Sequence, residues 1–123
     1  MALSTFLRNA LLDHYLGGTA YTQPTVRISL HTADPGITGA SEVAGGSYAR
    51  KPPTFSAASG GSKASSADID FTGMPACTVT HVGIWDALSG GNFLEGGALA
   101  ASKVVNAGDT FRLTQPNLVA SLT

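Results

Sequence analysis

Glycine and proline interrupt this chain so often that long regular elements are excluded over most of its length. The 123 residues include 15 glycines and 6 prolines, with five Gly-Gly pairs spread among them. Glycine is a residue of tight turns, so many glycines in a short chain imply short strands joined by turns. The Gly-Gly pairs are unevenly spaced, which excludes an internal repeat. The length fits a single domain.

One uninterrupted run, residues 3 to 16, has the periodicity of an α-helix. Its apolar residues form one broad face, but Leu12 and Leu16 fall outside it, so the helix is apolar on more than one side. Such a helix packs on its own domain or docks on a neighbouring subunit, and the pattern leaves open which face is buried within the chain. The residues that we expect at a partner interface are Leu3, Phe6, Leu7, Leu11, Leu12 and Leu16.

From residue 24 onward, apolar and polar residues alternate in short segments, which is typical of half-buried strands. In the segment 77–86 the alternation slips by one residue, so we expect a β-bulge near His81 to Gly83. A Gly-, Ala- and Ser-rich loop is expected over residues 36–47. The predicted strand segments are 26–31, 48–50, 68–71, 77–86, 93–94, 99–105, 110–114 and 117–123.

These segments predict a mainly β fold, an antiparallel β-sandwich of the jelly-roll or immunoglobulin-like kind with one N-terminal α-helix. The helix belongs to residues 1–18 and the sandwich to residues 19–123, within one domain overall.

The charge and cysteine content of the chain limit the kinds of partner and compartment that we expect. Only 12% of residues are charged and the net charge is -1, so no long-range field attracts nucleic acid or an anionic membrane. No apolar run approaches the ~20 residues of a bilayer span. The single Cys77 excludes an internal disulfide. Polar residues interrupt the N-terminal run too often for a signal peptide, so we expect synthesis in the cytoplasm.

The sequence offers no catalytic constellation. Cys77 and His81, four positions apart on one strand, lie roughly 13 Å from each other. No two histidines lie within five residues, and no cysteine pair is available for zinc. We therefore expect no catalytic residues, no metal, no cofactor and no Ser–His or Cys–His contact. Trp85 is expected in the core with its N–H bonded, rather than on an exposed carbohydrate platform.

Four phrases of the sequence, in this order, resemble a family of small structural proteins of tailed bacteriophages. They are LHTADPG (30–36), GASEVAGGSYARK (39–51), VTHVGIWDALSGGNFL (79–94) and NAGDTFRL (106–113). The resemblance covers roughly residues 24 to 123, and members are commonly described as tail-fibre-like, minor tail or virion structural proteins. It implies a place in the virion and partners among tail or capsid proteins, and it supplies no catalytic residues.

We thus expect a non-enzymatic, multi-copy tail or fibre-attachment protein on the particle exterior that forms a homo-oligomer. Within the chain, Arg50 is expected to pair with Asp34 or Glu42 and so to brace the long loop. One alternative is a capsid decoration protein that cements capsomers. Another is a carbohydrate-binding module for host-surface glycans, which requires an exposed aromatic platform around Tyr48 or Trp85.

Overall fold

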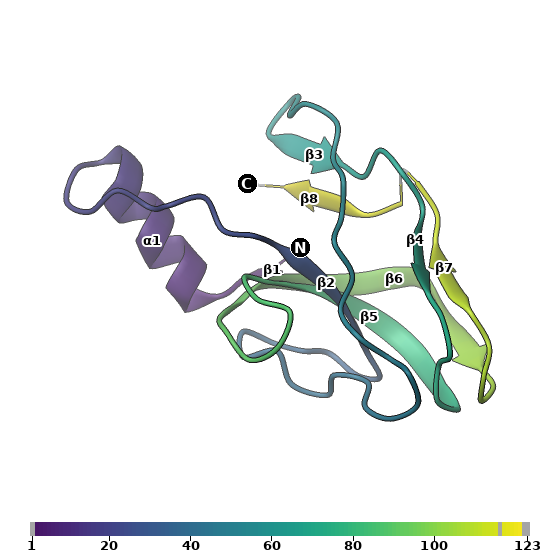
Figure 1. Cartoon of the computed structure of the whole chain (residues 1–123). Helices are drawn as coiled ribbons and strands as arrows, with labels where there is room; N and C mark the ends of the chain where they lie inside the picture. The colour runs from purple at the N-terminus through teal and green to yellow at the C-terminus, as the bar shows by residue number, and fades with distance from the viewer. Residues whose placement is uncertain (1, 116, 122–123) are drawn as a thin grey trace.

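The computed structural model of the chain describes residues 2–115 and 117–121. It is mainly β, with antiparallel ladders and one helix near the N-terminus, so the predicted fold class is confirmed (Figure 1). In chain order the elements are β1 (Ala2–Leu3), α1 (Thr5–Tyr15), β2 (Arg27–His31), β3 (Ser62–Ala64), β4 (Ile69–Phe71), β5 (Cys77–Trp85), β6 (Phe93–Val105), β7 (Phe111–Leu113) and β8 (Val119–Ser121).

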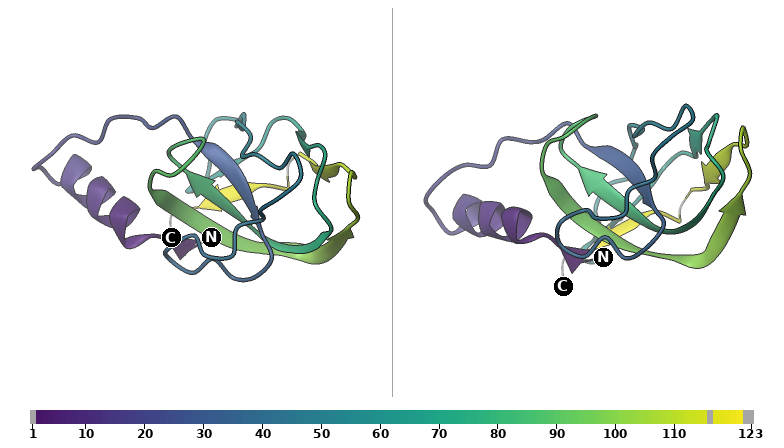
Figure 2. Two further views of the ribbon diagram at one scale, coloured as in Figure 1. Left: turned by 60° about the horizontal axis from the view of Figure 1, so that its bottom comes forward. Right: turned by 90° about the horizontal axis from the view of Figure 1, so that it is seen from below.

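The strands form one main sheet and two small ladders. The main sheet has the order β1-β6-β5-β2, and the ladders pair β3 with β8 and β4 with β7. Figures 1 and 2 show the β4–β7 ladder at the end of the main sheet away from α1. Main sheet and ladders together enclose one hydrophobic core, as the layers of a sandwich do. That core contains Ile28, Leu30, Val43, Ile69, Phe71, Met74, Val79, Val82, Ile84, Leu94, Val105, Phe111, Leu113 and Leu118.

The register of β5 and β6 is irregular next to His81, close to the predicted bulge. Val79 pairs with Lys103, whereas His81 pairs with Ala98, so the surplus residues lie in β6 and not in β5. A phase slip within one strand reports that the pairing is irregular, but it does not report which strand carries the extra residues. Gly83 has a different purpose, because a Cβ there would lie 2.7 Å from the side chains of both Ser29 and His31.

Four predicted segments differ clearly from the observed strands. Segments 93–94 and 99–105 are parts of the single strand β6, because the glycines between them continue the pairing with β5. Segment 48–50 is no strand; only the neighbouring Lys51 forms an isolated bridge, to Ile28. In segment 117–123 the strand is β8, and Leu122 lies outside the described residues.

Helix α1 is attached to the sheet at its start and projects from it (Figure 2). The preceding strand β1 pairs with β6 through Leu3 and Glu95. Ser4, which is buried, caps the helix by accepting a hydrogen bond from the backbone N–H of Leu7 at 3.2 Å. No residue of α1 is buried. In the described part of the chain, no helix is long and apolar enough to cross a membrane.

Candidate functional site

The segment between β2 and residue 51 folds over one face of the main sheet. Alternation along β2 sends Ile28 and Leu30 into the hydrophobic core and Ser29 and His31 to the opposite face, and all four are buried. The backbone of the segment is fastened to β2, since the N–H of Val43 donates to the carbonyl of Leu30 at 2.9 Å. This face of the sheet is therefore closed by the segment, which we name the braced loop (residues 32–51).

Arg50, near the end of the braced loop, is the centre of a cluster of polar contacts. Its Nε and Nη2 donate to the two carboxylate oxygens of Glu42 at 2.9 and 2.8 Å, a bidentate charge-assisted pair. Its Nη1 donates to the carbonyls of Ala87 and Gly90, at 3.0 and 2.9 Å, in the β5–β6 turn. The guanidinium also lies 3.8 Å from the ring centroid of Trp85, within cation–π range. One side chain thus connects the braced loop to the next turn.

Of the three residues expected to brace the loop, the structure brings two together. Arg50 contacts Glu42, whereas Asp34 forms a local turn in which its Oδ1 accepts from the N–H of Gly36 at 2.9 Å. Whether the Arg50–Glu42 pair holds the loop in place stays a prediction.

Tyr48 is a member of this cluster that the sequence did not single out for it. Its hydroxyl donates to Glu42 Oε2 at 2.9 Å and accepts from the N–H of Leu30 at 3.0 Å, and its ring stacks on Phe71. Burial alone would raise the pKa of Glu42, but the hydrogen bonds from Arg50 and Tyr48 outweigh it and lower that pKa. Burial raises the pKa of Tyr48. The carboxylate is therefore held ionised and the phenol neutral.

A second chain of hydrogen bonds runs through Ser29 and His31. Ser29 Oγ lies 2.7 Å from His31 Nε2, and it accepts from Trp85 Nε1 at 3.0 Å. His31 Nδ1 lies 2.8 Å from the carbonyl of Ala40. A carbonyl only accepts, so Nδ1 carries the proton and Nε2 accepts from the serine hydroxyl. The polar side-chain atoms of Ser29, His31 and Trp85 therefore all have partners.

The expectation that no Ser–His contact exists is therefore wrong. The expectation rested on the distance between Cys77 and His81. Ser29 and His31 are two positions apart on β2 and therefore share one face of the strand. The Ser29–His31 pair does not form an accessible nucleophile, because both side chains are fully buried. Burial also lowers the pKa of His31, which keeps the ring neutral. The arrangement fastens the braced loop to the sheet through Ala40.

The remaining candidates from the sequence are two aromatic residues, one cysteine and a metal site. Trp85 has its N–H bonded, as expected, but it is half-buried and lies outside the hydrophobic core, so its expected place in the core is wrong. Arg50 lies over the Trp85 ring and Tyr48 is stacked on Phe71, so neither is an open aromatic platform. Cys77 is a half-buried free thiol whose pKa is raised by burial. Over residues 2–115 and 117–121, no group of three His, Cys, Asp or Glu side chains has the arrangement of a metal site.

The residues expected at a partner interface divide into two sets. Leu7 packs against the hydrophobic core, Leu11 is half-buried, and Leu3 is held in β1. On the outer side, Leu12 and Leu16 are 46% and 69% exposed, and Phe6 is exposed near the start of the helix. Tyr15, at 68% exposure, belongs to the same outer side and was missed, although its spacing of three residues from Leu12 could have indicated it.

A comparison with known protein families shows the family to which the chain belongs. A family model described as podophage GP4 fiber I protein gp80 matches residues 2–121. The chain belongs to this fibre protein family. The expected relation to tail-fibre-like phage proteins is thereby confirmed, and the fibre family implies a structural role in the virion and association with other virion components. No curated protein matches the chain significantly.

Proposed function

We propose that this member of the podophage fiber I family is a non-enzymatic, multi-copy subunit on the exterior of the particle, and that α1 joins it to other virion proteins. The observation that carries the proposal is that α1 has no buried residue, while Leu12, Tyr15 and Leu16 at its far end are exposed. Burying a large apolar side chain stabilises a complex by about 1.5–3 kcal/mol. An uncovered helix of this kind suits repeated docking in a symmetric particle.

The braced loop serves the same role by keeping the subunit rigid. Arg50, which is paired with Glu42, connects the loop to the β5–β6 turn. In the first half of the loop, the hydrogen bond from the N–H of Gly36 to Asp34 forms a local turn. We propose that this bracing, rather than additional strands, stabilises the end of the subunit that carries these turns.

The fibre family favours a tail location over capsid decoration. The glycan-binding alternative lacks its platform, because the ring of Trp85 is covered by Arg50 and that of Tyr48 stacks on Phe71.

Gold labelling of an epitope-tagged chain on purified particles tests the location. We expect several gold particles per virion, on the fibres. Label on the capsid shell, or a chain absent from purified virions, would overturn the proposed function. As a test of α1, incorporation of the double variant Leu12→Ser/Leu16→Ser should fall, while Leu88→Ser, which changes an exposed leucine in the β5–β6 turn, should be incorporated normally.

A further inference from the structure

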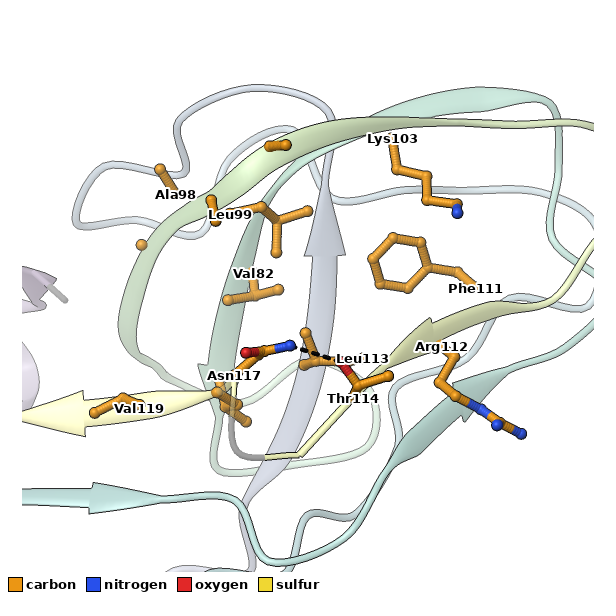
Figure 3. Close-up of a pocket in the computed structure, with 14 residues that line it drawn as sticks. Val82, Ala98, Leu99, Lys103, Phe111, Arg112, Leu113, Thr114, Asn117 and Val119 are labelled. Atoms are coloured by element: carbon orange, nitrogen blue, oxygen red, sulfur yellow. Dashed lines mark hydrogen bonds between the residues drawn. The ribbon is translucent and has the colours of Figure 1, made fainter.

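A groove opens between β6 and the C-terminal strands β7 and β8 (Figure 3). Its volume is about 440 Å³, far more than the ~30 Å³ share of one water. Figure 3 shows Val82, Leu99 and Phe111 pointing into it. Small residues of β6, among them Ala100 and Ala101, form one wall, so the groove has an apolar floor and room for large side chains.

The wall formed by β6 is also an open sheet edge. Among the described residues, β1 pairs with this edge at Glu95 and Gly96 only, and the groove begins at the next residue, Gly97. The surplus residues of β6 lie between Ala98 and Lys103, opposite Val79 to His81 of β5, and several of them line the groove.

The chain cannot fill this groove with its own helix. Strand β1 is antiparallel to β6, so the chain leaves Leu3 in the direction opposite to the groove, and Figures 1 and 2 show α1 and β7 at opposite ends. Among the described residues, each subunit therefore carries a helix with exposed apolar side chains and, beyond the end of the β1–β6 pairing, an open groove with an apolar floor.

We infer that the outer side of α1 from one copy docks into the β6–β7 groove of a second copy. This inference rests on the proposed fibre function and names the partner of the helix. The anchors are Leu12, Tyr15 and Leu16, at positions i, i+3 and i+4, the spacing by which helices enter apolar grooves.

The charges of the two surfaces match. Lys103 reaches over the groove, whereas Arg112, which is paired with Asp70, points away from it (Figure 3). The groove is thus lined by basic and no acidic side chains. The end of α1 that carries the anchors has an exposed Asp13 and the partial negative charge of a helix C-terminus. Lys103 of the acceptor copy faces this negative end in the docked pair.

Helix and groove are different surfaces, so the contact is head-to-tail. A head-to-tail contact closes into a ring or continues as a filament, depending on the rotation between copies. In either form, the same contact between subunits is repeated along many copies, which suits a component of a fibre.

Light scattering over a concentration series tests the joint in the full chain. The wild-type mass should rise above that of a monomer, and either Leu12→Ser/Leu16→Ser on the helix or Ala101→Arg in the groove should weaken self-association by about 100-fold. Leu88→Ser and Val104→Arg are the matched controls, because both positions are exposed and neither lies in α1 or lines the groove. A wild-type chain that stays monomeric, or variants that associate like wild type, overturns the inference.

Mixing the two defective variants separates head-to-tail docking from other joints. The helix variant keeps an intact groove and the groove variant keeps an intact helix, so the mixture should form a 1:1 dimer and nothing larger. A symmetric helix–helix joint gives no mixed dimer and would contradict the inference. The gold-labelling result is independent of these masses: label on the fibres with no self-association would retain the fibre function and remove only the groove as the partner.

Discussion

The braced loop and helix α1 differ in how they are attached to the same sheet. The loop has no regular secondary structure apart from isolated bridges, yet it buries Pro35, Val43 and Arg50. The helix is regular, yet none of its residues is fully buried, and Leu7 and Leu11 are only half-buried. A helix satisfies its backbone internally, so it can project into solvent, whereas a loop over a sheet must find partners for its backbone in the tertiary structure. In this protein, an element with regular secondary structure is therefore not the one whose side chains are more deeply buried.

The largest effect is expected from Arg50→Ala, which removes the residue that fastens the braced loop to the β5–β6 turn. The change removes the cation paired with the Glu42 carboxylate, which retains the hydrogen bond from Tyr48, and it leaves two turn carbonyls without the Arg50 donor. It should therefore lower the free energy of unfolding by about 3–5 kcal/mol. Urea denaturation followed by fluorescence measures it. Arg112→Ala is the matched control, because that arginine makes a similar bidentate pair with Asp70 but is 58% exposed, and little change is expected. If the stability and assembly of Arg50→Ala equal those of wild type, the braced loop does not depend on this pair.

A second test compares two glycines of the braced loop. Both Gly39 and Gly36 have positive φ, +79° and +59°, which costs any other residue about 1–2 kcal/mol. A Cβ at Gly39 would also overlap the ring of Trp85, whereas nothing lies within 4 Å of one at Gly36. Gly39→Ala should therefore destabilise more than Gly36→Ala, by about 1–3 kcal/mol, measured by thermal unfolding. Equal losses would mean that the loop is not packed tightly on the sheet.

Acid should loosen the braced loop in two steps. The lowered pKa of His31 means that its contribution is complete above the unfolded value of about 6.5 and is lost as the pH falls through the folded value. Glu42, also with a lowered pKa, adds a loss below about pH 4.3. Each group contributes a slope of at most about 1.4 kcal/mol per pH unit. Urea midpoints measured between pH 8 and about 3 check both steps, and a flat profile from pH 7.5 to 5.5 would contradict the role of His31.

The smallest effect is expected on the outer side of the helix. In an isolated subunit, Leu12→Ser/Leu16→Ser should change stability by about 0.5 kcal/mol or less, because both side chains are exposed. Leu7→Ser should cost more, since that side chain packs against the hydrophobic core. Chemical denaturation at low protein concentration keeps oligomerisation out of the measurement. A larger loss for the double variant would mean that the outer side already has a partner within the chain.

Some of the site was predictable because it depends on local spacing. Pairing of Arg50 with one of two nearby carboxylates was foreseen, but the choice of Glu42 was not, since it depends on where the loop crosses β2. The contact between Ser29 and His31 follows from the two-residue period of a strand and was available to the sequence argument. The links from Arg50 to Ala87 and Gly90 were not, because nearly forty residues separate them.

Local periodicity, turn residues and ordered motifs are readable without knowing the fold, and they were enough to predict most of the strands, the helix with two apolar sides, and the family. The length of β6, its surplus residues and the covering of a sheet face by the braced loop became visible in the structure alone. The same holds for the half-buried place of Leu7 and the exposure of Leu12 and Leu16. Those outcomes depend on which distant segments compete for the same surface, and burial of a side chain is a property of its neighbours in space rather than of its position in the chain.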